Sequence, residues 1–406
     1  MSNNLLLKER NMLSIIRVIK HKKVITKPEI VKITGLAQST VHNFINELQK
    51  KNIVIEDSIA DSTGGRKANI YRFNEKIFYV VAVDVGDSYL SACVFDLDLN
   101  EIYKTEQSYI LHDNSVEDGI EKIIFLIKEI ILNSKIDAFQ ILGIGITVSG
   151  PVDFENGKIY QITDAPKWKN IPLSLIIKDK IGIDTIIDKD NNSAALYYKT
   201  IYAFKEKQNL VFLCTRKGIG TGALIDGNIY RGKHCLAGEL GHIRIDPFGE
   251  VCKCGKIGCI EAFTSDPSIV NHALKIIKEG NKTLITELCD KNLSNITLQT
   301  IIKAAKNNDT VAMNIFKNTA DYLSIAIGNV IKIYDPDEII LDCVWLKSFN
   351  KIFNYVANKV YEENEFIDRD RLKIILNKED DILLYGAATL IIDHHLNNQA
   401  ESKFIN

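Results

Sequence analysis

Three cysteines and a histidine in one short stretch of the chain have the types and the spacing of metal ligands. Cys252, Cys254 and Cys259 fall within eight positions, and His242 precedes the first of them by ten. Three thiolates and an imidazole form a closed tetrahedral zinc site, which leaves no open position for a catalytic water. The alternative is a group of reduced thiols without a metal. We expect these four residues to bind a structural Zn2+ ion.

Two carboxylates flank this cluster. Glu239 lies three residues before His242, and Glu261 lies two residues after Cys259. A metal bound at the histidine and the cysteine would therefore hold both carboxylates in place.

The composition is that of an ordinary soluble globular protein. The chain has 406 residues, of which 46% are hydrophobic and 25% charged, and this length usually forms two or three domains. No stretch approaches the roughly 18 apolar residues of a membrane span, and the N-terminus does not resemble a signal peptide. We expect a cytoplasmic protein without a membrane segment, in which clustered cysteines more often bind metal than form disulfides.

The charge is distributed unevenly along the chain. Residues 1–74 carry a net charge of +7, while the whole chain carries −2, so that the remainder is acidic. A basic N-terminal part attached to an acidic body suggests that the N-terminal part binds a polyanion. Chance clustering of surface lysines is the alternative.

The N-terminal part has the signals of a helix-turn-helix. Residues 9–20 have apolar side chains at helical spacing. A second helix is expected from Thr26, a plausible N-cap, to Gly35, with Ile33 on its apolar face. A third helix is expected to open at Ser39 and to bury a stripe that includes Val41. Two short helices joined through a glycine turn form a helix-turn-helix.

The exposed face of the third helix suits DNA. Its side chains are Gln38, Ser39, Thr40, His42, Asn43 and Asn46. Short polar side chains fit base edges and phosphates in a major groove. Residues 53–74 are expected to form two strands around a glycine turn, with Arg66 and Lys67 at its tip as a basic wing. We therefore predict a winged helix-turn-helix over residues 1–76; a small protein-interaction domain is the alternative.

The rest of the chain alternates strands and helices in two halves. This pattern predicts a two-lobed α/β body with a cleft between the lobes. A helix is expected over residues 116–134 and a strand over 338–344. We expect the first lobe to comprise 77–190 and 376–400, and the second lobe, with the zinc site, 191–375.

Residues 78–395 resemble the ROK family (repressors, open reading frames and kinases), which has an actin- and hexokinase-like fold. The motifs that carry the resemblance are Glu239-x-Gly241-His242 and Cys252-x-Cys254-Gly255-x-x-Gly258-Cys259-x-Glu261. In this family they form a zinc site fused to a sugar pocket. The resemblance implies that Glu239, His242 and Glu261 hydrogen-bond sugar hydroxyls, for which carboxylates are strong acceptors.

Other positions match the family's sugar site in part. Gly150 and the proline after it resemble a loop over the sugar, and Asp164 stands where the family usually has asparagine. Asp190 matches the catalytic aspartate of an Asn-Asp-x-Asn motif, whose first asparagine is replaced by Lys189. The resemblance implies that Gly150, Asp164 and Asp190 contribute to sugar binding.

The nucleotide-binding elements of the family's kinases are altered. Three differences stand out: Asp84-Val85-Gly86-Asp87-Ser88 in place of Asp-x-Gly-Gly-Thr, Arg216-Lys217 in place of Gly-Thr, and Asp342-Cys343 in place of Gly-Gly. Charge and bulk at these positions oppose the close approach of a nucleotide. We expect a domain that binds a sugar but has lost ATP, with no catalytic residue.

These observations predict a sugar-responsive transcriptional repressor of sugar-catabolism genes. A homodimer, or a dimer of dimers, would bind operator DNA through two winged helices and take its sugar effector in the cleft. One alternative is an active sugar kinase with an accessory DNA-binding head and Asp190 as its base. Another is a repressor that a partner protein controls.

Overall fold

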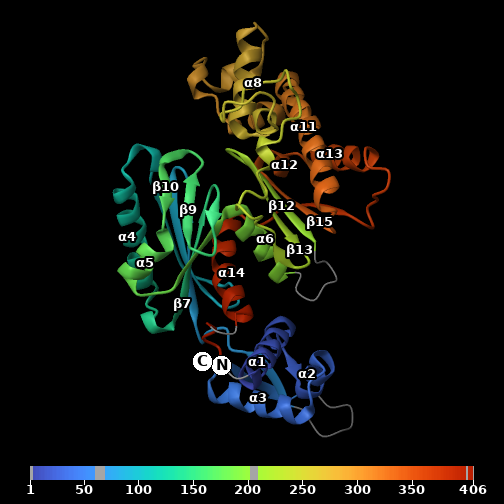
Figure 1. Ribbon diagram of the computed structural model, residues 1–406. Coiled ribbons are helices and arrows are strands. Elements are labelled where there is room, and N and C mark those ends of the chain that lie inside the picture. The colour runs from blue at the N-terminus through green and yellow to red at the C-terminus, as the bar shows by residue number, and fades with distance from the viewer. Residues whose placement is uncertain (1–2, 60–68, 202–208, 399–400, 406) are drawn as a thin grey trace. The chain divides into compact units, whose positions relative to one another are not determined.

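The computed structural model describes residues 3–59, 69–201, 209–398 and 401–405 (Figure 1). They form two compact units. The first holds the described residues up to Ser193, together with Thr200, Ile201 and those from Asp381 on. The second holds Ala194–Lys199 and the described residues from 209 to Asp380. The N-terminal part therefore belongs to the same unit as the first half of the body.

The N-terminal part, which we call the head, comprises the described residues from 3 to 76. Its elements are α1 (Asn3–Lys22), β1 (Ile25–Thr26), α2 (Lys27–Thr34), α3 (Gln38–Lys50), β2 (Val54–Ile59) and β3 (Asn69–Phe73). The strands form an antiparallel sheet in the order β1-β3-β2. The three helices pack through a shared apolar core, whose buried members include Ile16, Ile30 and Ile45.

Local signals in the sequence set the ends of α2. The backbone N–H of Thr26 donates to Glu29 Oε2 (2.8 Å), and Gly35 ends the helix in the left-handed conformation (φ 68°). The helix α3 begins at Gln38, one residue before the expected start. Ile33 was expected on the apolar face of α2, but it is 41% exposed. The residue of this helix that is buried in the core is Ile30.

The body of the first unit is built on a five-stranded sheet of order β11-β7-β4-β5-β6. Its elements are β4 (Tyr79–Val85), β5 (Tyr89–Asp96), β6 (Glu101–Ser108), α4 (Val116–Ser134), β7 (Ile141–Val148), β8 (Val152–Asp153), β9 (Lys158–Ile162), β10 (Ala165–Ile171), α5 (Leu173–Ile181), β11 (Thr185–Lys189) and α14 (Ile382–Asn397). The helices α4 and α14 pack on opposite faces of the sheet, and α14 shares its apolar core with the head. The predicted helix over 116–134 is confirmed.

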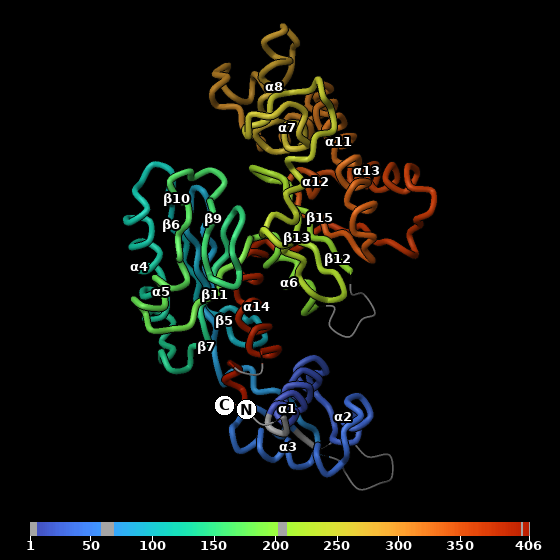
Figure 2. Tube along the Cα trace, viewed as in Figure 1, coloured from blue at the N-terminus to red at the C-terminus, as the bar shows by residue number. Residues whose placement is uncertain are grey.

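The second unit has a five-stranded sheet of order β14-β13-β12-β15-β16. Its strands are β12 (Leu210–Thr215), β13 (Ile219–Ile225), β14 (Asn228–Ile229), β15 (Glu338–Cys343) and β16 (Lys373–Leu376). Its helices are α7 (Glu261–Thr264), α8 (Asp266–Lys278), α9 (Leu284–Leu288), α10 (Leu298–Lys306), α11 (Thr310–Tyr334), α12 (Val344–Ser348) and α13 (Asn350–Glu362). The long helix α11 packs against α7, α8 and α13 (Figure 2). Helix α6 (Asp190–Ile201) contributes to both units.

Among the described residues, no helix is long and apolar enough to span a membrane.

Candidate functional site

The structure brings the four predicted metal ligands together in the second unit. One ligand atom from each of His242, Cys252, Cys254 and Cys259 lies within 4.8 Å of the others. The Cys254 and Cys259 sulfurs are 3.8 Å apart, and the Cys252 sulfur is 3.9 Å from His242 Nδ1. A tetrahedral site with zinc–sulfur bonds of about 2.3 Å has sulfur–sulfur distances of about 3.8 Å. The number, type and spacing of these donors fit Zn2+.

A tight loop presents the cysteines. The Cys252 N–H donates to the Lys256 carbonyl (2.8 Å), and the Gly255 N–H donates to the Cys252 carbonyl (2.8 Å). Gly258 has a φ of 76°, and a Cβ there would lie 1.5 Å from the Asp246 carbonyl oxygen. Only glycine fits at position 258, which explains that part of the motif.

The electrostatics of the loop favour a bound cation. Burial raises the pKa of the Cys252 thiol to about 12. Burial and the adjacent Cys254 also raise the pKa of Cys259. The pKa of Cys254 is lowered, because burial is outweighed by hydrogen bonds from the Lys256 backbone and the other two cysteines. Thiolates at Cys252 and Cys259 are therefore unfavourable by themselves, and a divalent cation would offset their charge.

Glu261 lies directly beside the cluster. Its side chain is 5% exposed, and its Oε2 accepts a hydrogen bond from the backbone N–H of Ile219 (3.3 Å). A Cβ at Gly218 would lie 2.8 Å from this oxygen, and one at Gly241 would lie 3.3 Å from it. These two glycines leave room for the carboxylate. Their role was not predicted from the sequence, although Gly241 stands in the Glu239-x-Gly241-His242 motif.

Glu239 immediately precedes the short 3-10 helix η3 (Leu240–His242), and its carbonyl accepts from the His242 N–H (3.2 Å). Both flanking carboxylates thus belong to backbone that a metal at His242 and Cys259 would fix.

The remaining predicted sugar residues, Gly150, Asp164 and Asp190, belong to the first unit, whereas Glu239, His242 and Glu261 belong to the second. Asp190 is half-buried at the first position of α6, and its Oδ1 accepts from the Asn191 N–H (2.6 Å).

The neighbouring backbone leaves room only for a glycine at position 150. Asp164 lies in the turn between β9 and β10. Gly150 has a φ of 116°, and a Cβ there would lie 2.4 Å from the Gln161 carbonyl oxygen. Asp164 is half-buried. In the motif with Asp190, the Asn192 side-chain amide donates to buried Asp188 (3.0 Å), which holds the start of α6 on the end of β11.

The two altered kinase positions of the second unit pair with each other. Asp342, at the end of β15, is 1% exposed, and its carboxylate lies 2.6 Å from Arg216 Nη2 and 3.1 Å from Lys347 Nζ. The Asn377 amide donates to the same carboxylate (2.9 Å). Burial opposes ionisation, but Arg216, Asn377 and Lys347 hold the pKa of Asp342 below its ordinary value. Asn377 was missed in the sequence because it lies far from any recognised motif. Lys347, five residues after Asp342, was missed because its spacing alone does not show that it points at the carboxylate.

In the first unit, the side chain of Tyr89 packs against the altered loop of residues 84–88. The Tyr89 hydroxyl donates to Asp84 Oδ2 (2.5 Å), and the Thr147 hydroxyl donates to Asp84 Oδ1 (3.1 Å). The Tyr89 ring lies so close to the loop that a Cβ at Gly86 would be 2.5 Å from it. The ring therefore covers the backbone at Gly86.

The helix α3 of the head presents a polar face. Of the residues predicted to contact DNA, Gln38, Ser39, His42 and Asn43 are exposed, and Thr40 and Asn46 are half-buried. Arg66 and Lys67 lie outside the described residues.

Both ring nitrogens of His42 have partners within the head. Nδ1 lies 3.3 Å from Lys27 Nζ, and Nε2 lies 3.0 Å from Asn46 Nδ2. Lys27 also lies over the Tyr71 ring at 5.0 Å. Both partner atoms are donors and a neutral imidazole has one acceptor nitrogen, so His42 accepts a hydrogen bond from only one of the two.

The ROK family pattern matches residues 80–391. The chain belongs to the ROK family. It is 29% identical to the xylose repressor of Caldicellulosiruptor bescii over 402 residues, 98% of each chain. A solved ROK family transcriptional regulator, a homologue of the Escherichia coli MLC protein, superimposes with a TM-score of 0.83 at 23% identity over 98% of each chain.

The predicted ROK fold of the body is confirmed by a second structure. The ROK hexokinase from Thermus thermophilus superimposes with a TM-score of 0.62 at 21% identity, over 97% of its own length and 77% of this chain. The kinase thus aligns over nearly its whole length, but it leaves part of this chain unmatched. The ROK regulator spans nearly all of it.

Proposed function

We propose that this protein is a transcriptional repressor that binds operator DNA through its head and a sugar through its ROK body. The observation that carries the proposal is the match to a xylose repressor over 98% of both chains. A ROK kinase matches only 77% of this chain.

The head acts as a winged helix-turn-helix. The helices α2 and α3 are joined by a three-residue turn at Gly35, and the exposed residues of α3 are short and polar. Such a helix lies in the major groove, where amide and hydroxyl side chains bond base edges. Arg66 and Lys67 remain a predicted basic wing that contacts phosphates.

The body binds the sugar beside a structural zinc ion. When bound, the metal neutralises three thiolates and holds the loop that carries Glu239 and Glu261. These carboxylates and His242 accept and donate hydrogen bonds to hydroxyls, and Gly150, Asp164 and Asp190 are the further candidates on the first unit. Charge-assisted hydrogen bonds to hydroxyls are strong and directional, which suits recognition of one sugar among many.

The body does not transfer phosphate. Arg216 and Lys347 are both paired with the buried carboxylate of Asp342, and Tyr89 covers the loop at Gly86. Phosphoryl transfer requires groups that hold the triphosphate and its metal. A coupled kinase assay with ATP and a panel of hexoses, pentoses and amino sugars should give no turnover. Turnover that the Asp190→Asn substitution abolishes would establish the kinase instead.

The repressor works as a homodimer in the cytoplasm. One head contacts a short half-site, so two heads related by two-fold symmetry are needed for an operator of ordinary length. Genome-wide mapping of DNA bound by the purified protein tests the proposal. We expect a small set of two-fold symmetric sites near sugar-catabolism genes, and uniform binding to all DNA would refute the repressor.

A further inference from the structure

The short segment that follows α14 packs between the head and the body sheet. Phe404 is fully buried. Its ring lies 5.8 Å from the ring of Phe73, on β3 of the head, and 6.2 Å from that of Phe78, which precedes β4 of the body. It also lies 6.3 Å from the ring of His395 on α14. A single aromatic side chain thus fills the core shared by the head, the sheet and α14.

The backbone of this segment is held from both sides. Lys51, at the end of α3, donates to the Ile405 carbonyl (2.6 Å). The side chain of Lys403, which belongs to the segment, donates to the carbonyl of Leu142 on β7 of the body (2.8 Å). Ser402 is also fully buried. The segment Ser402–Ile405 therefore connects the end of α3 to the central sheet.

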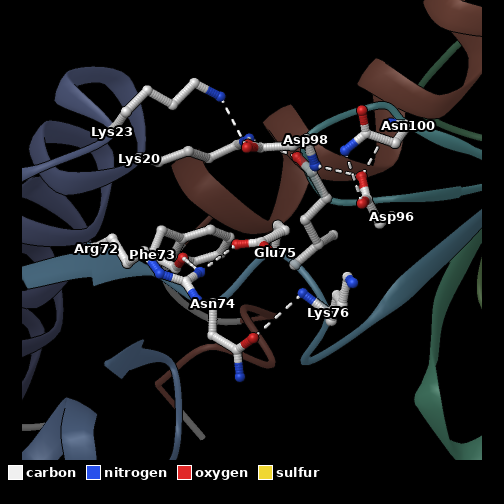
Figure 3. A network of polar contacts seen from close by, with 11 residues as sticks. Lys20, Lys23, Arg72, Phe73, Asn74, Glu75, Lys76, Asp96, Asp98 and Asn100 are labelled. Carbon is white, nitrogen blue, oxygen red and sulfur yellow. Dashed lines mark hydrogen bonds and ion pairs between the residues drawn. The ribbon is translucent and has the colours of Figure 1, made fainter. Parts of the chain in front are cut away.

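A second, polar contact joins the head to the body independently of this segment. Lys20 and Lys23, at the end of α1, bind Asp98 in the turn between β5 and β6, at 3.2 Å and 2.8 Å (Figure 3). Lys20 also donates to the Leu97 carbonyl (2.5 Å). Burial opposes ionisation of Asp98, but the two lysines hold its pKa below its ordinary value. The head is therefore attached at this ion-pair contact as well as at Ser402–Ile405.

The course of the chain links Ser402–Ile405 to the second unit. The second unit ends at Asp380, and the chain passes directly into α14 and then into Ser402–Ile405. The helix α14 also contacts α1, where Arg17 donates to Asn397 Oδ1 (3.0 Å). A change in the position of α14 would thus reach the head both through α1 and through Phe404.

We propose that Ser402–Ile405 is the coupling element of the molecule. It fixes the orientation of the head on the body, and it transmits a change at the second unit to α3. This inference rests on the proposed repressor function. In physical terms, sugar binding shifts an equilibrium between two orientations of the head, and Phe404 makes the contact that distinguishes them.

The test compares Phe404→Ala, and a chain that ends at Glu401, with a matched control. Phe366→Ala removes the same ring from a position in the second unit that is 88% exposed. We expect sugar affinity, measured by calorimetry, to stay within about twofold of the unmodified protein in all variants. Because coupling energies in proteins usually correspond to about 5- to 150-fold changes in affinity, we expect sugar to lower DNA affinity by such a factor in the control. In Phe404→Ala the factor should fall below about two. A normal sugar response in both tail variants would overturn the proposal.

Hydrogen exchange separates a failure of this inference from a failure of the repressor function. It needs neither DNA nor sugar. Amides of β3 and α3 should exchange faster in Phe404→Ala than in Phe366→Ala, while those of β12 and β15 should be unchanged. If the unmodified protein responds to no sugar but this difference is seen, the repressor function fails and the attachment of the head by Phe404 stands. If the amides of β3 and α3 are unchanged, the coupling role fails whatever the DNA experiments give.

Discussion

Asp342 and Arg216 form an ion pair in the second unit. Asp342 would be unfavourable there alone, because a buried charge needs a partner, whereas the Arg216 side chain is 34% exposed. Removing one member of a buried pair usually destabilises a protein by about 3–5 kcal/mol. Because Arg216 and Lys347, which would remain, are about one-third exposed, we expect Asp342→Ala to lower the free energy of unfolding by about 1–3 kcal/mol in urea titrations at pH 7.

The control for this prediction is Glu250→Ala. It removes an ion pair with Lys275 in which both side chains are more than 60% exposed, and exposed pairs contribute about 0–1 kcal/mol. Equal destabilisation by the two substitutions would mean that the buried cluster around Asp342 has no special role.

Asp266 should make stability depend on pH. Burial raises its pKa from 3.8 to about 6, although Arg216 opposes the shift. The folded state then holds a proton that the unfolded state releases, so this group's contribution to stability is full below about pH 4 and is lost as the pH rises to about 6. We expect the free energy of unfolding of Asp266→Asn, which stays neutral, to exceed that of the unmodified protein by about 1–3 kcal/mol at pH 7.5 in urea titrations. At pH 4 the two proteins should be equally stable. A variant that is less stable at pH 7.5 would show that the carboxylate is stabilising.

The cysteine cluster should hold one metal. Elemental analysis of the purified protein should give about one zinc per chain, and Cys252→Ser with Cys259→Ser should remove it and lower sugar affinity, because the loop carrying Glu261 is released. Cys235→Ser changes a cysteine outside the cluster and serves as control. Full zinc content in the double variant would contradict the assigned ligand set.

At the scale of elements, Lys27 and Asn43 should affect DNA binding differently. Lys27→Ala should weaken binding to all sequences alike and reduce the slope of log affinity against log salt by about one, as loss of a phosphate contact does. Asn43→Ala should lower the preference for operator over random DNA, because an exposed amide on α3 reads base edges. Lys128→Ala, an exposed lysine on α4, removes the same charge far from the recognition face. Fluorescence anisotropy at several salt concentrations measures all three, and identical salt slopes in Lys27→Ala and Lys128→Ala would exclude the phosphate contact.

Local signals made many elements predictable from the sequence. Thr26 and Gly35 set the two ends of α2, and the amphipathic pattern of residues 116–134 corresponds to α4. Contacts between distant segments were not predictable in the same way. Nothing in the local sequence indicates that Arg216 pairs with Asp342, which depends on the pairing of β12 with β15, or that Phe404 packs on Phe73, which depends on where the segment after α14 lies. The cysteine cluster was an exception, since one short loop supplies three of its four ligands.

At the scale of the whole molecule, the second unit must act on the head, which belongs to the first unit, for a sugar to control DNA binding. A ligand can shift the orientation of the head only by as much as its affinities for the two states differ. The zinc loop and the carboxylates beside it belong to the second unit, while α14 and the head belong to the first. The proposed sugar residues therefore lie on both units: Glu239, His242 and Glu261 on the second, and Gly150, Asp164 and Asp190 on the first, with the head. The chain passes between the units within α6 and again just before α14.

The proposed function requires that a sugar alone, without ATP, changes the affinity of this protein for its operator. The most direct measurement titrates a panel of sugars, beginning with xylose, into a preformed complex of the protein with a labelled operator duplex, and follows the anisotropy of the label. We expect one sugar to release the DNA by lowering affinity about 5- to 150-fold, at unchanged salt and in the absence of nucleotide. Anisotropy that no sugar changes, or that changes only when ATP is added, would contradict the account.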